Sequence, residues 1–350
     1  MNSAGRLPVL DGLRAISILL VLATHMLPEG PKILRLNETT GAMGMSLFFA
    51  LSGFLIVSGL RHNGDVAEFM VKRLSRVVPL AYAYICFVFS FLYFDPKDML
   101  WTATFLVNYF TEYLNSYNGH FWSLCVEVQF YVAIALVILC LGRRSIWIVW
   151  PACLAITALR ISAGARIAIE THLRGDEILA GACLATLYQN SWSGRAKYPT
   201  LLIIVTTLLW FTSSSPYSGW CQYLRPYATV SLLAVVLCLG DTLLATLLAS
   251  RPMRYIAATS YALYVIHPLT IHGWWNEGTI FDRYMIKRPI SFAMTFAAAH
   301  VSTFYWERPW LQAGRQWIKQ RRLRHPNSDL AGSGQRPIMT NVPRSKEQGP

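Results

Sequence analysis

Long apolar runs recur along almost the whole chain, and they constrain the fold more than any other feature of the sequence. A lipid bilayer needs about 20 apolar residues per crossing helix, and fewer where polar side chains face protein instead of lipid. The runs predict membrane-spanning helices over residues 9–27, 43–60, 77–94, 121–141, 146–161, 176–189, 200–213, 227–249, 255–275 and 289–306. The expected fold class is an all-α integral membrane protein with about ten transmembrane helices.

Composition agrees with a membrane protein. Hydrophobic residues make up 54% of the 350 residues and charged residues 14%, whereas a soluble domain carries about 25% charged residues. The net charge of +13 comes from residues between the apolar runs, which is typical of a topology signal and not of a nucleic-acid-binding face. The seven cysteines have no Cys-x-x-Cys spacing, so we expect neither disulfides nor a metal site.

The positive charges predict the orientation of the chain, because cytoplasmic loops hold the excess of Lys and Arg. With both termini in the cytoplasm, about two thirds of the 31 Lys and Arg residues lie on the inner side. The apolar run 99–110 is too short to cross and predicts a re-entrant or interfacial helix. We expect residues 1–310 to form the membrane domain. Residues 311–350 are expected to form a basic cytoplasmic tail, whose first part lies along the anionic inner leaflet and whose end is disordered from about Pro326.

Ionisable side chains inside a membrane are costly, so each one is a candidate for a functional site. Arg14 follows Asp11 at the start of the first apolar run, and His25 lies near its end. Eleven residues are close to three helical turns, which places Arg14 and His25 on one face, about 16 Å apart. The alternative is an arginine that only sets topology and a histidine that is hydrogen-bonded to a neighbouring helix.

Three further segments carry candidate site residues. Arg73 and Arg76 are three residues apart, and two neighbouring guanidiniums suit a phosphate group, although ordinary positive flanking explains them equally well. Glu127 follows Trp122 by five residues and enters the bilayer from outside, where it could meet His25, or serve in a structural ion pair or a proton relay. The last segment is a run in which three polar residues share a helix face: Ser260, Tyr264 and His267. We expect His267, Tyr264, Asp11 and Trp122 to bind substrate or support the site.

Other polar positions give weaker signals. Ser52 and Gly53 lie in the middle of an apolar run, where small residues usually indicate close helix packing. Arg174, Asp176 and Glu177 could contact a polar acceptor or only solvate a loop. Together, the stronger candidates predict a site for a long ligand with a phosphate-rich head and a reactive far end. Coenzyme A thioesters match this description.

Six segments resemble the acyltransferase 3 family of integral membrane acyltransferases: LDGLRAISILLVLATH, SLFFALSGFLI, KRLSRVVP, WSLCVEVQFY, SYALYVIHP and ERP. They occur in the order that is typical of the family and cover residues 7 to 310. Lys72 stands where many members have another arginine, which leaves the Arg73–Arg76 motif whole. The chain has no counterpart of the soluble hydrolase-like domain of some members, so we expect no second transfer step in it.

The resemblance implies transfer of an acyl group, usually acetyl, from cytoplasmic acetyl-CoA to a hydroxyl of a cell-surface or exported glycan or glycolipid. It implies His25 as the catalytic histidine, and Arg14, Arg73 and Arg76 as residues of the donor channel. It also implies a multi-pass protein of the bacterial inner membrane. The expected partners are acyl-CoA, a glycan or lipid-linked saccharide and the bilayer, without nucleic acid or metal; a homo-oligomer is left open.

Two mechanisms and a rival function follow from these residues. In the direct route His25, oriented by Glu127, removes the proton from the acceptor hydroxyl as it attacks the thioester. The competing route passes through an acyl-histidine. The rival function is a proton-coupled transporter or flippase, in which His25 and Glu127 form a proton relay. The Arg73–Arg76 pair favours the enzyme, because a relay does not need it.

Overall fold

A computed structural model describes residues 7–63, 65–192, 194, 196–274 and 277–324. Within these ranges the regular structure is entirely helical and contains no β-strand. The N-terminal half contains the longest helices, which are α1 (Pro8–Met26), α2 (Leu36–Asn63), α3 (Val66–Phe91), α4 (Pro96–Ala103) and α5 (Phe121–Leu141). The predicted spans 9–27 and 121–141 agree with α1 and α5 to within one residue at each end.

The C-terminal half contains shorter helices. They are α6 (Val149–Ser162), α7 (Thr171–Arg174), α8 (Asp176–Leu187), α9 (Pro199–Ser214), α10 (Arg225–Leu237), α11 (Leu243–Leu248), α12 (Arg251–Ile271), α13 (Arg288–Val301) and α14 (Arg308–Arg324). Two π-helical segments, η7 (Asp282–Lys287) and η8 (Ser302–Glu307), flank α13.

Five helices in the described part are long and apolar enough to cross a bilayer. They comprise Pro8–Met26, Leu36–Arg61, Val66–Phe91, Phe121–Leu141 and Arg143–Ser162. A sixth crossing is available if α9 and the segment Gly219–Leu237, which are bent by 117° relative to each other, count as one broken span. The structure therefore supports a multi-pass helical protein, while ten spans and cytoplasmic termini stay predictions.

Three predicted boundaries need correction. The predicted span 77–94 is part of a longer helix, α3, which begins at Val66 and includes the charged residues before position 77. The predicted span 227–249 is two helices, α10 and α11, separated by a break. The first part of the expected tail, residues 311–324, belongs to the helix α14; the segment expected to be disordered lies within residues 325–350, outside the described residues.

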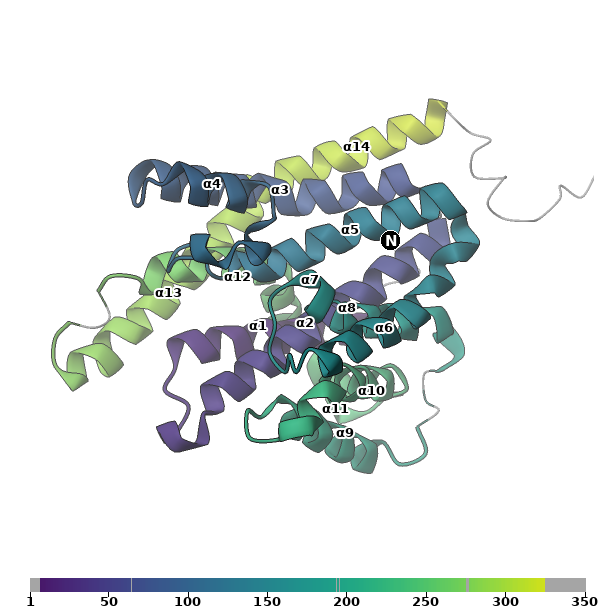
Figure 1. Cartoon of the computed structure of the whole chain (residues 1–350), viewed down its shortest axis with the longest axis horizontal. Coiled ribbons are helices and arrows are strands. Elements are labelled where there is room, and N and C mark those ends of the chain that lie inside the picture. The colour runs from purple at the N-terminus through teal and green to yellow at the C-terminus, as the bar shows by residue number, and fades with distance from the viewer. Residues whose placement is uncertain (1–6, 64, 193, 195, 275–276, 325–350) are drawn as a thin grey trace, which may run out of the picture.

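The centre of the fold is the crossing of α2 with α8 (Figure 1). A Cβ atom built at Gly53 would lie 1.8 Å from the carbonyl oxygen of Ile178, and one at Gly181 would lie 1.9 Å from that of Ala50. The two helix backbones therefore touch, and the prediction of close packing at Gly53 is confirmed. In Figure 1, α3, α5 and α14 lie on one side of this crossing, and α9, α10 and α11 lie on the other.

Buried ion pairs fix α8 against its neighbours. Arg160 of α6 pairs with Asp176, and Arg225 of α10 donates from Nε to Glu177 Oε1 at 2.7 Å. Arg174 Nε lies 3.3 Å from Glu177 Oε2. All five side chains are buried, so the loop solvation considered for 174, 176 and 177 is ruled out. Charges buried this deeply need partners, and we assign these residues to the fold.

Candidate active site

Helix α1 links the two halves of the candidate site. Pro8 occupies its first turn, where a missing N–H costs no helical hydrogen bond. Arg14 lies two turns in and is half-buried, and His25 lies in the last turn and is exposed. The helix therefore carries the guanidinium and the imidazole at opposite ends, as the spacing predicted.

Three guanidiniums interact electrostatically near the start of α1. The charges of Arg73 and Arg76 on α3 act on Arg14, as do those of Asp11 and Glu127. The Arg73 guanidinium also lies 5.6 Å from the centre of the Tyr131 ring. We call Arg14, Arg73 and Arg76 the arginine cluster. The structure brings together the three residues that the sequence proposed for the donor.

A large cavity opens beside Arg14, with a volume of about 1,230 Å³. Helices α1, α2, α8, α10 and α11 line it, and its charged lining residues are Asp11, Arg14, Arg61 and Asp241. Arg61 closes one wall, because its Nη1 donates to the carbonyl oxygens of Ala185 and, at 2.8 Å, of Thr186 at the end of α8. Ligand sites in proteins commonly enclose about 300–1,000 Å³, so the cavity has room for an extended ligand.

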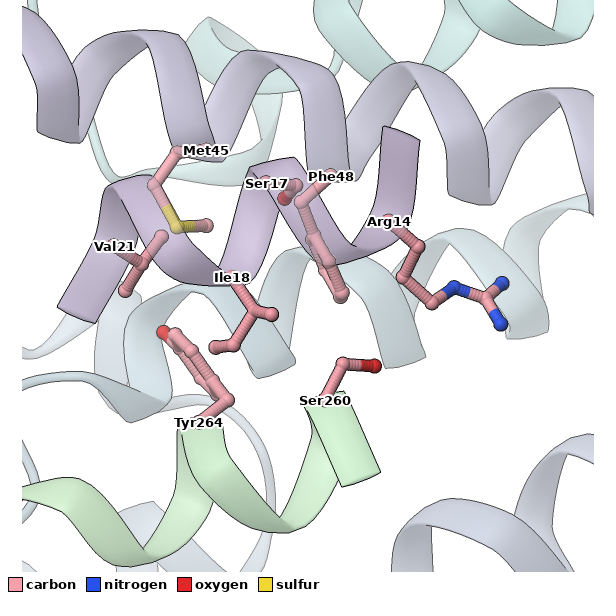
Figure 2. A pocket seen from close by; sticks show the side chains of 8 residues that line it. All are labelled: Arg14, Ser17, Ile18, Val21, Met45, Phe48, Ser260 and Tyr264. Atoms are coloured by element: carbon pink, nitrogen blue, oxygen red, sulfur yellow. The ribbon is translucent and has the colours of Figure 1, made fainter. Parts of the chain in front are cut away.

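A second, narrow gap leads from Arg14 along α1 (Figure 2). Its volume is about 10 Å³, close to the space of one water molecule. Residues of α1, α2 and α12 line it, namely Arg14, Ser17, Ile18, Val21, Met45, Phe48, Ser260 and Tyr264. Figure 2 shows the Arg14 guanidinium at one end of this set and Tyr264 towards the other. Arg14 thus borders both the large cavity and the gap.

Three histidines gather beyond Tyr264, and we call them the histidine cluster. The ring centre of His267 lies 5.1 Å from that of His25 and 5.5 Å from that of His120. Nδ1 of His267 lies 2.7 Å from the carbonyl oxygen of Tyr264. A carbonyl can only accept a hydrogen bond, so Nδ1 carries the proton and Nε2 is an acceptor. The contact therefore fixes the tautomer of a buried histidine next to His25.

Tyr264 joins the histidine cluster to the start of α5. Its hydroxyl donates to the carbonyl oxygen of His120 and pairs with the hydroxyl of Ser123. Both ring nitrogens of His120 are buried without a hydrogen-bond partner within 3.5 Å. Sequence reasoning found Tyr264 but missed His120, although it directly precedes the Phe121–Trp122 element. A single histidine at a helix start has no periodicity that would have identified it.

Glu127 has different neighbours from those predicted. Its Oε1 accepts a hydrogen bond of 2.7 Å from Ser52, and its carboxylate also bonds the hydroxyl of Tyr131. Its charge acts on Arg14, whereas the ring next to His25 is that of His267. Seven residues of helix, about 10 Å, separate Glu127 from His120. The carboxylate therefore lies towards the arginine cluster, which corrects the predicted pairing with His25.

Trp122 also lies apart from the contacts of His25. Its ring packs edge-on against Phe49 at 5.9 Å, and the Arg174 guanidinium lies 5.4 Å from its centre. Trp122 therefore connects α5 to the buried ion pairs of α8. Within the ranges that the structure covers, no group of three His, Cys, Asp or Glu side chains is arranged to hold a metal ion.

Comparison with known families decides the identity of the domain. The model of the acyltransferase 3 family, described as an acyltransferase domain, matches residues 7–306. This chain belongs to the acyltransferase 3 family. The match covers both clusters and every helix up to η8, so the family resemblance seen in the six sequence segments is confirmed. No solved structure matches the chain.

Relatives of this acyltransferase 3 family chain include two bacterial proteins. It is 27% identical to the O-acetyltransferase OatA of Staphylococcus aureus over 320 residues, covering 76% of this chain and 51% of that protein. It is 25% identical to the putative peptidoglycan O-acetyltransferase YrhL of Bacillus subtilis over 313 residues, covering 75% and 48%. The chain thus spans about half the length of the curated relatives it matches.

Proposed function

We propose that this chain is a membrane O-acyltransferase that moves an acyl group, by preference acetyl, from cytoplasmic acyl-CoA to a hydroxyl of an exported or cell-surface glycan or glycolipid. The observation that carries the proposal is the position of Arg14. It borders the large cavity, belongs to the arginine cluster and begins the gap that ends at Tyr264. Acyl-CoA has a phosphate-rich head at one end and a reactive thioester at the other. It therefore needs a positively charged site for the head and a separate, neutral site for the thioester.

In this account the nucleotide part of acetyl-CoA lies in the large cavity, and the arginine cluster binds its phosphates through charge-assisted hydrogen bonds. The pantetheine arm follows the gap, which widens when it binds. The thioester then lies near the histidine cluster. This places the donor on the cytoplasmic side and the acceptor on the other side of a multi-pass protein of the inner membrane, with ten spans and both termini inside.

His25 acts as the general base. It removes the proton of the acceptor hydroxyl while the oxygen attacks the thioester carbonyl, the carbon–sulfur bond breaks, and the proton passes to the departing thiolate. His267 supports His25, because its tautomer is fixed by the Tyr264 carbonyl. A burst of one acyl group per enzyme without acceptor would instead indicate an acyl-histidine. A proton relay has less support than the enzyme, since Glu127 bonds Ser52 and Tyr131.

Transfer of labelled acetyl from acetyl-CoA into cell-envelope material tests the proposal. Membranes would contain wild-type protein, His25→Ala, or His172→Ala, matched for expression. His172 is an exposed histidine that stacks on Tyr109, away from the cluster, and serves as the control. We expect transfer with the wild type and His172→Ala and loss with His25→Ala. Equal transfer by all three would remove His25 from the chemistry.

A further inference from the structure

Helix α14 runs antiparallel to the first half of α3 (Figure 1). Gly314 contacts Ser75, while Arg321 and Arg322 contact Asp65 and Glu68. Residue numbers therefore rise along α14 as they fall along α3. The α3 segment covered in this way includes Arg73 and Arg76.

The two helices also approach closely at the arginine motif itself. A Cβ atom at Gly314 would lie 2.8 Å from Ser75 Oγ and 3.1 Å from Ser75 Cβ. Ser75 stands between Arg73 and Arg76 in the sequence. The backbone of α14 therefore packs closely on the helical turn that carries both guanidiniums, and a larger residue at position 314 would require Ser75 to move.

Ion pairs hold the far end of α14 to the start of α3. Arg322 donates from Nε and Nη2 to the two oxygens of Glu68 at 2.6 and 2.7 Å, a forked geometry that fixes orientation. Glu68 is only 2% exposed, and its other cationic neighbour is Lys72 at 3.4 Å. Loss of Arg322 would leave a buried carboxylate with one weaker partner.

Asp65 adds a second pair and caps α3. Its side chain accepts from the backbone N–H of Glu68 at 3.0 Å, and Arg321 Nε lies 3.3 Å from Oδ2. Burial acts to raise the pKa of Asp65, but the Glu68 N–H and the Arg321 charge outweigh it and hold the pKa below its ordinary value. The carboxylate is therefore charged at neutral pH, as the pair requires.

The segment before α14 contacts α3 on the other side of the motif. Trp306 Nε1 donates to the carbonyl oxygen of Pro79 at 3.3 Å, and Glu307 interacts with the charge of Arg76. Contacts from residues 306–322 thus reach α3 on both sides of the arginine motif and at its centre.

We propose that α14 is a positioning element of the donor site, which holds α3 so that Arg73 and Arg76 face Arg14. The inference rests on the proposed function, because it assumes that the arginine cluster binds acyl-CoA. It assigns the role to Gly314 and Arg322, neither of which belongs to the cluster. These residues act through α3 and do not touch the donor.

Steady-state kinetics of the full chain in proteoliposomes, with acetyl-CoA varied, tests the inference. We expect Arg322→Ala to raise the donor KM about 5- to 10-fold with little change in kcat, as loss of positioning without loss of chemistry requires. Arg322→Lys keeps the charge and should recover part of this loss. Lys319→Ala removes an exposed cation from the same helix and should match the wild type.

The Gly314–Ser75 contact gives a second, independent test. Gly314→Ala should raise the donor KM by pushing Ser75 away, and adding Ser75→Ala should lower it again, because the nearest clashing atom is removed. A merely structural contact would alter kcat and thermal stability and leave the KM alone. Recovery by the double variant is the result that stability alone does not explain.

Arg73→Ala and Arg76→Ala separate failure of this inference from failure of the proposed function. If neither raises the donor KM, the cluster does not bind the donor and the proposed function fails. If they raise it while Arg322→Ala and Gly314→Ala behave like Lys319→Ala, α14 is not a positioning element. Should Arg322→Ala not fold, Arg322→Lys and the Gly314 pair of variants still decide between these outcomes.

Discussion

The arginine cluster and the histidine cluster occupy opposite ends of α1 and are built differently. The guanidiniums come from α1 and α3 and share their surroundings with the carboxylates of Asp11, Glu127 and Glu307. The histidines come from α1, α12 and the start of α5, and rings and backbone carbonyls surround them. Guanidiniums that can form charge-assisted hydrogen bonds suit binding of an anion, whereas a fixed tautomer suits proton transfer. The comparison indicates that binding and chemistry are separated along one helix.

The largest effect is expected from a substitution that disrupts the arginine cluster and the histidine cluster together. Gly53→Ala places a Cβ 1.8 Å from the Ile178 carbonyl oxygen, so α2 and α8 must separate, at a cost of about 3 kcal/mol or more. We expect a large loss of folded protein, measured as yield and thermal midpoint in detergent. Gly59→Ala on the same helix meets no atom within 4 Å and should leave the midpoint unchanged. Equal midpoints for the two variants would mean that the crossing is looser than described.

The second largest effect is expected on binding of the acyl-CoA donor alone. Arg14→Ala or Arg76→Ala removes a charge-assisted hydrogen bond of about 1.5–3 kcal/mol, which predicts a donor KM about 10- to 100-fold higher. The kcat should change much less, because the histidine cluster stays intact. Kinetics with varied acetyl-CoA measure both. A fall in kcat at unchanged KM would mean that the arginine cluster takes part in the chemistry. That result would contradict the separation of binding from chemistry along α1.

A smaller effect should fall on chemistry alone. Tyr264→Phe leaves the His120 carbonyl and the Ser123 hydroxyl without their shared partner, and a neutral hydrogen bond contributes about 1 kcal/mol. We expect kcat to fall about 3- to 10-fold, with an unchanged donor KM. Tyr217→Phe removes an exposed hydroxyl that bonds the Ile33 carbonyl and is the control. A rise in donor KM would show that Tyr264 serves binding.

The smallest effect tests whether Glu127 acts on Arg14, as the structure indicates, or on His25, as the sequence predicted. Glu127→Gln keeps one oxygen that can accept the hydrogen bond from Ser52 but removes a negative charge beside Arg14. We expect the donor KM to fall about 2- to 5-fold, with kcat unchanged, because the net positive charge of this end rises. If Glu127 orients His25 instead, kcat would fall about 100-fold or more.

The fold was predictable where apolar length alone defines a helix, as in α1 and α5. It was not predictable where a charged stretch is stabilised by a distant partner. The sequence placed Arg73 and Arg76 on one helix surface, but it did not show that this helix begins at Val66, where α14 supplies Arg321 and Arg322 to Asp65 and Glu68. The same partnership holds residues 311–324 as a helix against α3, whereas the sequence predicted only a basic segment along the inner leaflet.

The candidate site was likewise predictable only in part from the sequence. The spacing of Arg14 and His25 on one helix could be read from the sequence, since both follow the same periodicity. The pairing of His267 with His25, the presence of His120 and the true neighbours of Glu127 depend on how α5 and α12 pack against α1. Those distances are tertiary, and no spacing within one segment contains them.

Calorimetric titration with coenzyme A, which binds without reacting, tests the central claim of two separate regions most directly. The proteins would be wild type, His25→Ala and Arg76→Ala. The account predicts that His25→Ala binds within about threefold of the wild type, a difference under about 0.7 kcal/mol, while Arg76→Ala binds about 10- to 100-fold more weakly. Equal weakening by both substitutions, or wild-type affinity of Arg76→Ala, would contradict the separation of binding from chemistry along α1.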